Sequence, residues 1–226
     1  MRNWGFLTNH AHVLIQVARN PRSTVREIAL ATGITERAAI SALHDIRRAG
    51  IASARREGRQ NVHRVDMGAL LRHRPWATSG MAIPESLVLA TLRGLGDVGG
   101  VDPASIAPAP RRPPSSDGQD LRGTARRWGF LTNHALILIH VTQHPRSTVR
   151  EIALAVGITE RAAHAALQDL RETGIVDRQR EGRRNSYTVN FEHLAAFRRE
   201  GAAPDLVPGA FVSSLVQGLL ELRPRG

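Results

Sequence analysis

The sequence contains no cysteine and no lysine. Without cysteine the chain cannot form disulfides, iron–sulfur clusters or cysteine-based zinc sites, and thiol catalysis is excluded. All 31 basic residues are arginines, and against 20 acidic residues they give a formal net charge of +11. A GC-rich genome would explain the choice of arginine over lysine. The surface is basic in either case, which favours a polyanion such as nucleic acid as a partner.

Long hydrophobic runs and catalytic motifs are also missing. The longest apolar runs, such as residues 135–141, are far too short to span a bilayer. The first residues lack the basic-then-apolar layout of a signal peptide, so we expect a cytoplasmic protein that makes no membrane contact. No Ser-His-Asp arrangement, phosphate-binding loop or pair of carboxylates stands out. The sequence therefore predicts a protein that is not an enzyme and needs no cofactor.

Several histidines raise the alternative of a metal sensor, because imidazole is a common metal ligand. No carboxylate–histidine cluster accompanies them in the sequence, and two of them begin a repeated helical segment. We therefore predict a structural or capping role for them and no metal site. The histidines concerned are His10, His12, His134, His140 and His144.

A domain-sized repeat dominates the chain. The segment "WGFLTNHA" at 4–11 returns at 128–135, and "PRSTVREIALA" at 21–31 returns at 145–155. At this offset of 124 residues, about 40 of 63 aligned positions are identical. A repeat of this length indicates the duplication of a whole folding unit and not a short solenoid period.

The composition predicts three parts: a first domain over 1–95, a Pro/Gly/Ser-rich flexible linker over 96–125, and a second domain over 126–226. Each domain ends in a tail where Pro84 or Pro208 precedes an apolar helical pattern. Such a tail helix closes the core of its own domain or pairs two chains into a homodimer, and both alternatives stay open. The apolar positions of the two patterns are Leu87, Ala90 and Thr91, and Phe211, Leu215 and Leu219.

Within one unit the apolar spacing predicts three helices. Gly33 ends the second and Gly50 ends the third, because glycine most easily takes a left-handed conformation. Two short helices joined by a tight turn at a glycine are typical of a helix-turn-helix. The inward positions of the third helix are Ala39, Ala42, Leu43 and Ile46. The residues expected to cap the three helices are Thr8 or Asn9, Thr24 in a capping box with Glu27, and Thr35.

After the third helix the pattern changes to a hairpin. "IASARREGRQNVHRV" and "IVDRQREGRRNSYTV" each contain two strand-like runs around Glu-Gly. A hairpin directly after a helix-turn-helix is a wing. The fold class that we predict is mainly α with small β wings (α+β), as two tandem winged helix-turn-helix domains, each with a C-terminal helix.

These residues carry a resemblance to known families. "ITERA", "GI" and "REGRRN" resemble winged helix-turn-helix regulators of the MarR and ArsR kind. The combined string W-x-F-L-T-N-H-A…G-I-T-E-R-A…E-G-R-R-N is similar to short winged-helix regulators common in actinobacteria. The resemblance covers about 63 residues of each half and not the linker. Those regulators carry one unit, so the tandem duplication is a departure from their pattern.

The resemblance implies double-stranded DNA as the partner. In such folds the third helix enters the major groove, and arginines of a wing tip reach the minor groove or phosphates. The threonines can act as helix caps alone, and the charged wing can be a solvated loop, so these alternatives stay open. The residues expected at DNA are Thr35, Glu36, Arg37, Ile40, Ser41, His44, Arg55, Arg56, Arg59 and Asn61 in the first unit. In the second they are Thr159, Glu160, Arg161, His164, Gln168, Arg180, Arg183, Arg184 and Asn185, with Ala165 also facing outward.

The two units differ in ways that bear on this function. In the third helix, half of the changed positions fall on the expected DNA face, which suggests non-identical half-sites; drift at exposed positions is the alternative. Residues 1–95 carry a net charge of +8, the linker −1 and residues 126–226 +4. We therefore expect the first unit to bind DNA more strongly when isolated.

The function predicted from the sequence is that of a sequence-specific DNA-binding protein, a transcriptional regulator in which the two units act as a covalent pseudo-dimer. A flexible linker of about 28 residues reaches about 30 Å, close to the roughly 34 Å between recognition helices of a dimer. One alternative is a nucleoid-associated architectural protein of low specificity. Another is a winged-helix module that binds a protein. No residue names a small-molecule effector.

Overall fold

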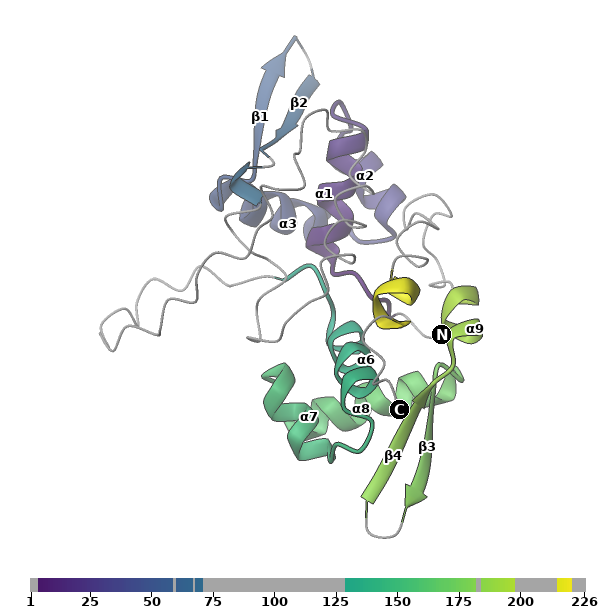
Figure 1. The fold of residues 1–226 in the computed structure, drawn as a ribbon. Coiled ribbons are helices and arrows are strands. Elements are labelled where there is room, and N and C mark those ends of the chain that lie inside the picture. The colour runs from purple at the N-terminus through teal and green to yellow at the C-terminus, as the bar shows by residue number, and fades with distance from the viewer. Residues whose placement is uncertain are drawn as a thin grey trace, which may run out of the picture.

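The computed structural model contains two units that share an order of three helices followed by two strands (Figure 1). The residues that the structure describes are 4–58, 60–66, 68–70, 129–181, 184–197 and 215–220. The first unit contains α1 (Asn9–Arg19), α2 (Val25–Thr32), α3 (Glu36–Arg48), β1 (Ala52–Glu57) and β2 (Gln60–Val65). The second contains α6 (Asn133–Gln143), α7 (Val149–Val156), α8 (Glu160–Glu172), β3 (Val176–Glu181), β4 (Arg184–Val189) and α9 (Phe191–Ala196).

The helix boundaries follow the predicted caps. Thr8 rather than Asn9 caps α1, since its side chain accepts a hydrogen bond from the Ala11 N–H. Thr24 begins α2 in a complete capping box with Glu27, and Gly33 ends it at φ 64°. These contacts satisfy backbone N–H groups that a helix start leaves without intrahelical partners. The second unit repeats the same caps at Thr132, Thr148, Gly157 and Thr159.

The core of each unit surrounds its first helix. Positions 11–17 of α1 and 135–142 of α6 are buried on every side, as expected of a helix enclosed by neighbours. In α3 the buried residues are the four that the apolar spacing predicts: Ala39, Ala42, Leu43 and Ile46. The helix-turn-helix therefore holds one face of α3 against the core and leaves the other face at the surface.

Each wing is a two-stranded antiparallel hairpin, as the sequence predicts. In the first, Ala52 pairs with Val65 and Glu57 with Gln60, around Gly58 at φ 62°. The His63 N–H donates to the Pro21 carbonyl at 2.7 Å, which ties β2 to the turn before α2. In the second wing Tyr187 donates to Pro145 in the same way at 2.8 Å. The wing is thus fixed against the helix-turn-helix at one end and projects at the other (Figure 1).

The two units meet through the segments that precede α1 and α6. Leu7 and Leu131 form an antiparallel bridge. The Thr8 N–H donates to the Phe130 carbonyl at 2.9 Å, and the Thr132 N–H donates to the Phe6 carbonyl at 3.0 Å. Each contact therefore recurs with the roles of the units exchanged, as in an interface related by a two-fold axis.

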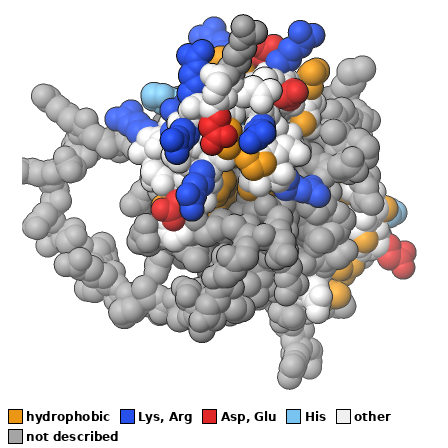
Figure 2. Space-filling model, turned by 90° about the horizontal axis from the view of Figure 1, so that it is seen from above, with side chains coloured by type: hydrophobic (Ala, Val, Ile, Leu, Met, Phe, Trp, Pro, Cys, Tyr) orange, Lys and Arg blue, Asp and Glu red, His pale blue; other side chains and the backbone are white. Residues whose placement is uncertain are grey.

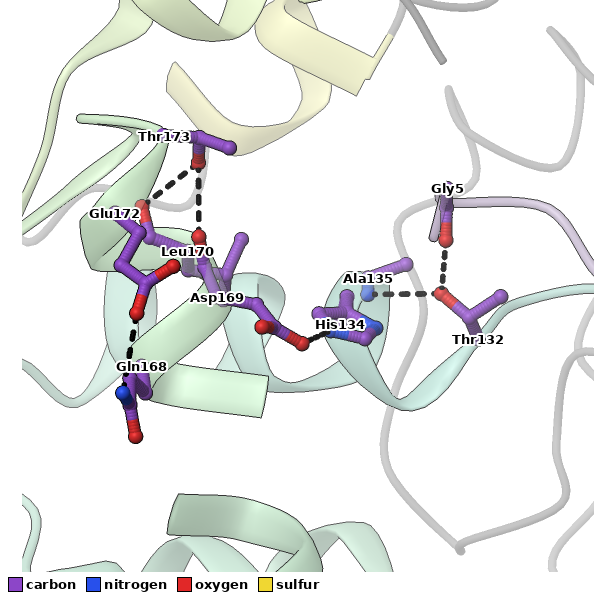
Figure 3. A network of polar contacts seen from close by, with 9 residues as sticks. All are labelled: Gly5, Thr132, His134, Ala135, Gln168, Asp169, Leu170, Glu172 and Thr173. Carbon is purple, nitrogen blue, oxygen red and sulfur yellow. Dashed lines mark hydrogen bonds and ion pairs between the residues drawn. The ribbon is translucent and has the colours of Figure 1, made fainter. Parts of the chain in front are cut away.

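The side chains of the two capping threonines repeat this exchange. The Thr8 hydroxyl donates to the Gly129 carbonyl at 2.6 Å. The Thr132 hydroxyl donates to the Gly5 carbonyl, also at 2.6 Å (Figure 3). In Figure 1 the units are related by an approximate half-turn, so β1–β2 and β3–β4 project from opposite ends of the molecule. The two repeats follow each other in the same direction along the sequence, but in space they are related by a two-fold rotation.

Aromatic packing closes this junction. The Trp4 ring stacks on His134 of the other unit, with centroids 4.3 Å apart and planes 9° apart. Trp4 also stacks on Phe197 at 4.7 Å and meets Phe6 edge-on at 5.6 Å. Aromatic pairs in offset and edge-to-face arrangements of this kind add stability beyond that expected from the area that they bury.

The predicted tails are described in part. Leu215 and Leu219 are buried in a helical segment over 215–220, which supports the predicted second tail helix. The first tail helix, its apolar positions Leu87, Ala90 and Thr91, and Phe211 lie outside the described residues, as does the linker. The domain boundaries at 95 and 126 therefore stay predictions. The short helix α9, capped by Asn190, was not predicted from the sequence.

Candidate nucleic-acid interface

The third helix of each unit presents its predicted outer face to the surface. All six outward positions in each copy are exposed: Thr35, Glu36, Arg37, Ile40, Ser41 and His44 in the first, and Thr159, Glu160, Arg161, His164, Ala165 and Gln168 in the second. Ile40 is 55% exposed, so a partner surface can cover it. The structure therefore brings the predicted helix residues together on one accessible helix face.

Thr35 and Thr159 cap α3 and α8 as predicted, and their hydroxyl groups can still donate a hydrogen bond. The Thr35 Oγ accepts from the Ala38 N–H, and the Thr159 Oγ accepts from the Ala162 N–H, both at 3.2 Å. Accepting these bonds leaves the hydroxyl hydrogen able to donate. Capping is thus confirmed, while donation to a phosphate stays a prediction.

Beside the outer face of α3 lies an open groove of about 690 Å³, formed with the start of α2 and with β2. Its charged side chains are all arginines. Residues that line it include Arg22, His44, Arg47, Arg48, Asn61 and His63. Figure 2 looks at the end of the molecule that carries the first wing and shows Arg side chains gathered around it.

Four of these lining residues were missed by the sequence analysis: Arg22, Arg47, Arg48 and His63. Arg47 and Arg48 lie one helical turn beyond His44, so extending the outward pattern by a turn would have found them. Arg22 comes just before the α2 capping box and pairs with Glu57 of the wing at 3.6 Å. Its place in the groove depends on how the wing packs, which local spacing does not reveal.

Histidine at position 63 adds little positive charge to this groove. Burial lowers the pKa of His63, and the nearby Arg47 lowers it further, while a hydrogen bond with the Ser23 backbone acts in the opposite direction. The ring is therefore neutral at pH 7 and the positive potential comes from the arginines. In the second unit Tyr187 takes this place, and burial raises its pKa, so its phenol stays protonated.

The second unit has a smaller groove at the equivalent place, with a volume of about 410 Å³. Among the described residues that line it are two arginines and two acidic residues, whose formal charges cancel. Its charged and polar lining includes Gln168, Arg171, Glu172, Asp177, Arg178 and Tyr187. The two grooves therefore differ in volume and in the charged residues described around them.

Wing residues are placed in part. Arg55 and Arg56 on β1 and Asn61 on β2 are exposed, and Arg56 lies opposite Asn61. The Arg56 Nε donates to the Gly58 carbonyl at 3.3 Å, which folds the side chain back over the turn. In the second wing Arg180 is exposed opposite Asn185, which is half-buried and hydrogen-bonded to Tyr187. Arg59, Arg183 and the side chain of Arg184 lie outside the described residues.

The first histidines of the two repeats have a structural role. His10 pairs with Asp45 at 3.0 Å, and His134 pairs with Asp169 at 2.9 Å, which joins α1 to α3 and α6 to α8. The sequence analysis predicted a structural role for them but did not identify these aspartate partners, which lie 35 residues away along the chain. Among the residues that the structure describes, no group of three or more His, Asp or Glu could hold a metal ion.

Comparison with known proteins is consistent with this geometry. Residues 128–184 match the model of the MarR family, over a stretch that contains α6, α7, α8 and β3. The first unit has the same element order and most of the same residues. Comparison with curated proteins and with solved structures gave no match. No helix in the described part of the chain is long and apolar enough to cross a membrane.

Proposed function

We propose that this protein is a sequence-specific binder of double-stranded DNA that regulates transcription. In this function α3 and α8 enter successive major grooves, and the wing arginines contact the minor groove or phosphates. A regulator of this kind acts at the nucleoid, in the cytoplasm. It needs no cofactor and catalyses no reaction.

One observation carries the proposal: an exposed helix face lies beside an arginine-lined groove in a winged-helix unit. Arg37 and Arg161 occupy the same exposed place in the first turn of α3 and α8. Arginine donates two hydrogen bonds to the O6 and N7 atoms of guanine and also suits phosphates. The match of residues 128–184 to the MarR family favours the same function.

The exchanged contacts between Thr8 and Thr132 support a covalent pseudo-dimer. Helix-turn-helix dimers place their two recognition helices one helical turn of DNA apart through a two-fold interface. Linkage in one chain raises the effective concentration of the second unit into the millimolar range for a short linker. Pairing of two chains through the tail helices would add a further level of assembly to this pseudo-dimer, while no residue names a small-molecule effector.

The test is in-vitro selection of the full chain on a random duplex library, followed by affinities at two salt concentrations. We expect a bipartite site with two related halves. Arg37→Ala and Arg161→Ala should each weaken binding to one half-site by about tenfold. Arg26→Ala is the matched control, because it removes the same charge from an exposed position of α2 that does not line the groove.

Two results would replace the proposal with another function. Binding without a motif and with a steep salt dependence would indicate a nucleoid-associated architectural protein. Failure to bind any duplex would indicate that the winged-helix units bind a protein partner instead.

A further inference from the structure

The equivalent grooves of the two units differ at a few defined positions. Arg48, the last residue of α3, is replaced by Glu172 in α8, and His44 is replaced by Gln168. Arg47, by contrast, is kept as Arg171. The two helices have the same length and equivalent N-caps, Thr35 and Thr159, so these replacements change the chemistry at equivalent places.

In the second unit these two replacements form a pair. The Gln168 Nε2 donates a hydrogen bond to the Glu172 Oε1 at 3.0 Å, one helical turn along α8 (Figure 3). A carboxylate only accepts hydrogen bonds, so this contact directs the amide nitrogen toward Glu172. The amide oxygen of Gln168 is then the group left to accept a hydrogen bond from a partner.

The end of α8 is held by further contacts. The Thr173 hydroxyl donates to the Leu170 carbonyl at 3.0 Å and to the Asp169 carbonyl at 3.2 Å (Figure 3). His134, against which Trp4 of the other unit stacks, binds the Asp169 carboxylate. The first unit has Ala49 in place of Thr173 and so lacks the hydroxyl contacts. Gln168 thus projects from a helix turn that is fixed on both sides.

The second groove also contains more acidic residues than the first among the residues described. The first groove holds Arg22, Arg47 and Arg48 and no acidic residue. In the second, Glu172 and Asp177 offset the charges of Arg171 and Arg178. The replacement of Arg48 by Glu172 exchanges a positive for a negative charge, so the second groove gains less from counterion release, which supplies the sequence-independent part of DNA affinity. Binding by the second unit then depends more on base contacts than binding by the first.

From the paired side chains and the unequal charge we infer that the two units have separate tasks on the DNA. This inference rests on the proposed function. The first unit binds phosphates through its groove arginines and supplies affinity. The second discriminates bases through Gln168, and Glu172 is its positioning residue. Because the Gln168 oxygen is an acceptor, it selects a base that presents an amino group in the major groove, adenine or cytosine.

The test uses the full chain and the site obtained by selection. Each position of the second half-site is changed to all four base pairs, and affinities are measured at two salt concentrations. Glu172→Ala should reduce discrimination at one position about fivefold or more, the scale of a lost base contact. Glu172→Gln keeps an acceptor oxygen for Gln168 but removes the charge. It should therefore keep the base preference. Both variants should bind the non-preferred sequences more tightly, because a negative charge near the DNA is removed.

Arg48→Ala is the matched control at the equivalent place of the first unit. It should weaken binding to every sequence alike and reduce the salt slope by about one, as expected for a lost phosphate contact. Gln168→Ala should remove the same base preference as Glu172→Ala. Circular dichroism of each variant verifies that the helices are retained.

The outcomes separate the inference from the function on which it rests. If no site is selected, both fail. If a site is selected but Glu172→Ala keeps the full base preference, or Arg48→Ala changes base preference as strongly, the division of tasks is wrong and DNA recognition stands. If Glu172→Gln loses the preference together with Glu172→Ala, charge and not positioning is responsible.

Discussion

At the scale of single residues, the duplication supplies a comparison within one molecule. Gly50 and Gly174 follow α3 and α8 at the same φ of 71°, a conformation that side chains with a Cβ disfavour. Their surroundings differ. A Cβ at position 50 meets nothing within 4 Å, whereas one at position 174 would lie 2.6 Å from Nδ1 of His193. An alanine at position 50 therefore tests backbone strain alone, whereas an alanine at position 174 tests backbone strain together with the displacement of His193.

We predict that Gly50→Ala lowers the free energy of unfolding by about 1–2 kcal/mol, the cost of a left-handed alanine. Gly174→Ala should cost about 1 kcal/mol more, because His193 must move and lose its 3.0 Å contact with the Gly174 carbonyl. Urea denaturation of the two variants measures the difference. Equal losses would mean that His193 moves at no cost.

Two buried histidines predict how stability depends on pH. Burial lowers the pKa of both His63 and His140 in the folded protein. The unfolded chain takes up these protons first, so stability is lost as pH falls below about 6.5, the ordinary histidine pKa. The other copy carries Tyr187 and Gln16 at the equivalent positions. A protein with His63→Tyr and His140→Gln should therefore lose less stability between pH 7 and pH 5.

Thermal unfolding at a series of pH values measures this difference. The pH range in which the histidines reduce stability is separate from that of Glu27. Hydrogen bonds from Thr24 lower the pKa of Glu27, so the stability that it contributes is lost only as the pH falls below about 4.5. Identical pH profiles for the variant and the parent protein would contradict the assignment.

At the scale of elements, the sequence predicts those features that depend on local chemistry. The caps of α1, α2 and α3, the buried face of α3 and the two hairpins follow from side chains within a few residues of each other. The helix α9 does not, since six residues are too short for a clear apolar period. Its position depends on Leu194, which is fully buried in the tertiary structure.

In the candidate interface, too, some features follow from local sequence spacing and others depend on tertiary packing. The outward residues of α3 and α8 follow from helical spacing. The groove does not, because Arg22 in the turn before α2, Arg47 on α3 and His63 on β2 are brought together only by tertiary packing. The hydrogen bond between Gln168 and Glu172 spans one helical turn, yet spacing alone does not show which way the amide points.

The cap of α9 supports a prediction about this element. The Asn190 side chain accepts hydrogen bonds from the N–H groups of Glu192 and His193, at 3.1 and 3.0 Å. We expect Asn190→Ala to cost about 1 kcal/mol of stability and to speed amide exchange in α9. Asn190→Asp keeps an accepting oxygen and should retain both properties. Unchanged exchange in the alanine variant would show that packing of Leu194 alone holds the helix.

At the scale of the whole molecule, two threonines connect the first helix of each unit to the junction between the units. Thr8 and Thr132 each cap a helix and also bind across the junction. Thr24 and Thr148 each cap a helix but make no such contact among the described residues. The chain therefore offers two pairs of substitutions that remove the same local interaction, of which only one also loosens the junction.

We predict that the double variant Thr8→Ala, Thr132→Ala separates the two units, whereas Thr24→Ala, Thr148→Ala does not. Both should lose about 2 kcal/mol from their helix caps. Spin labels on Leu30→Cys and Leu154→Cys report the distance, since both positions are exposed and the chain has no cysteine of its own. The first variant should broaden the distance distribution. Equal distributions in the two variants would show that the aromatic contacts of Trp4 suffice.

The exchanged bonds at Leu7 and Leu131 give the molecule the symmetry of a dimer, but the two halves remain chemically unlike. A dimer of identical subunits makes the same contacts in either of its two orientations on a symmetric site. In the proposed complex this chain does not, because Arg48 faces one half of the site and Glu172 faces the other. A bound molecule therefore has a direction along the DNA, and whatever lies beside the site meets the first unit on one flank and the second on the other.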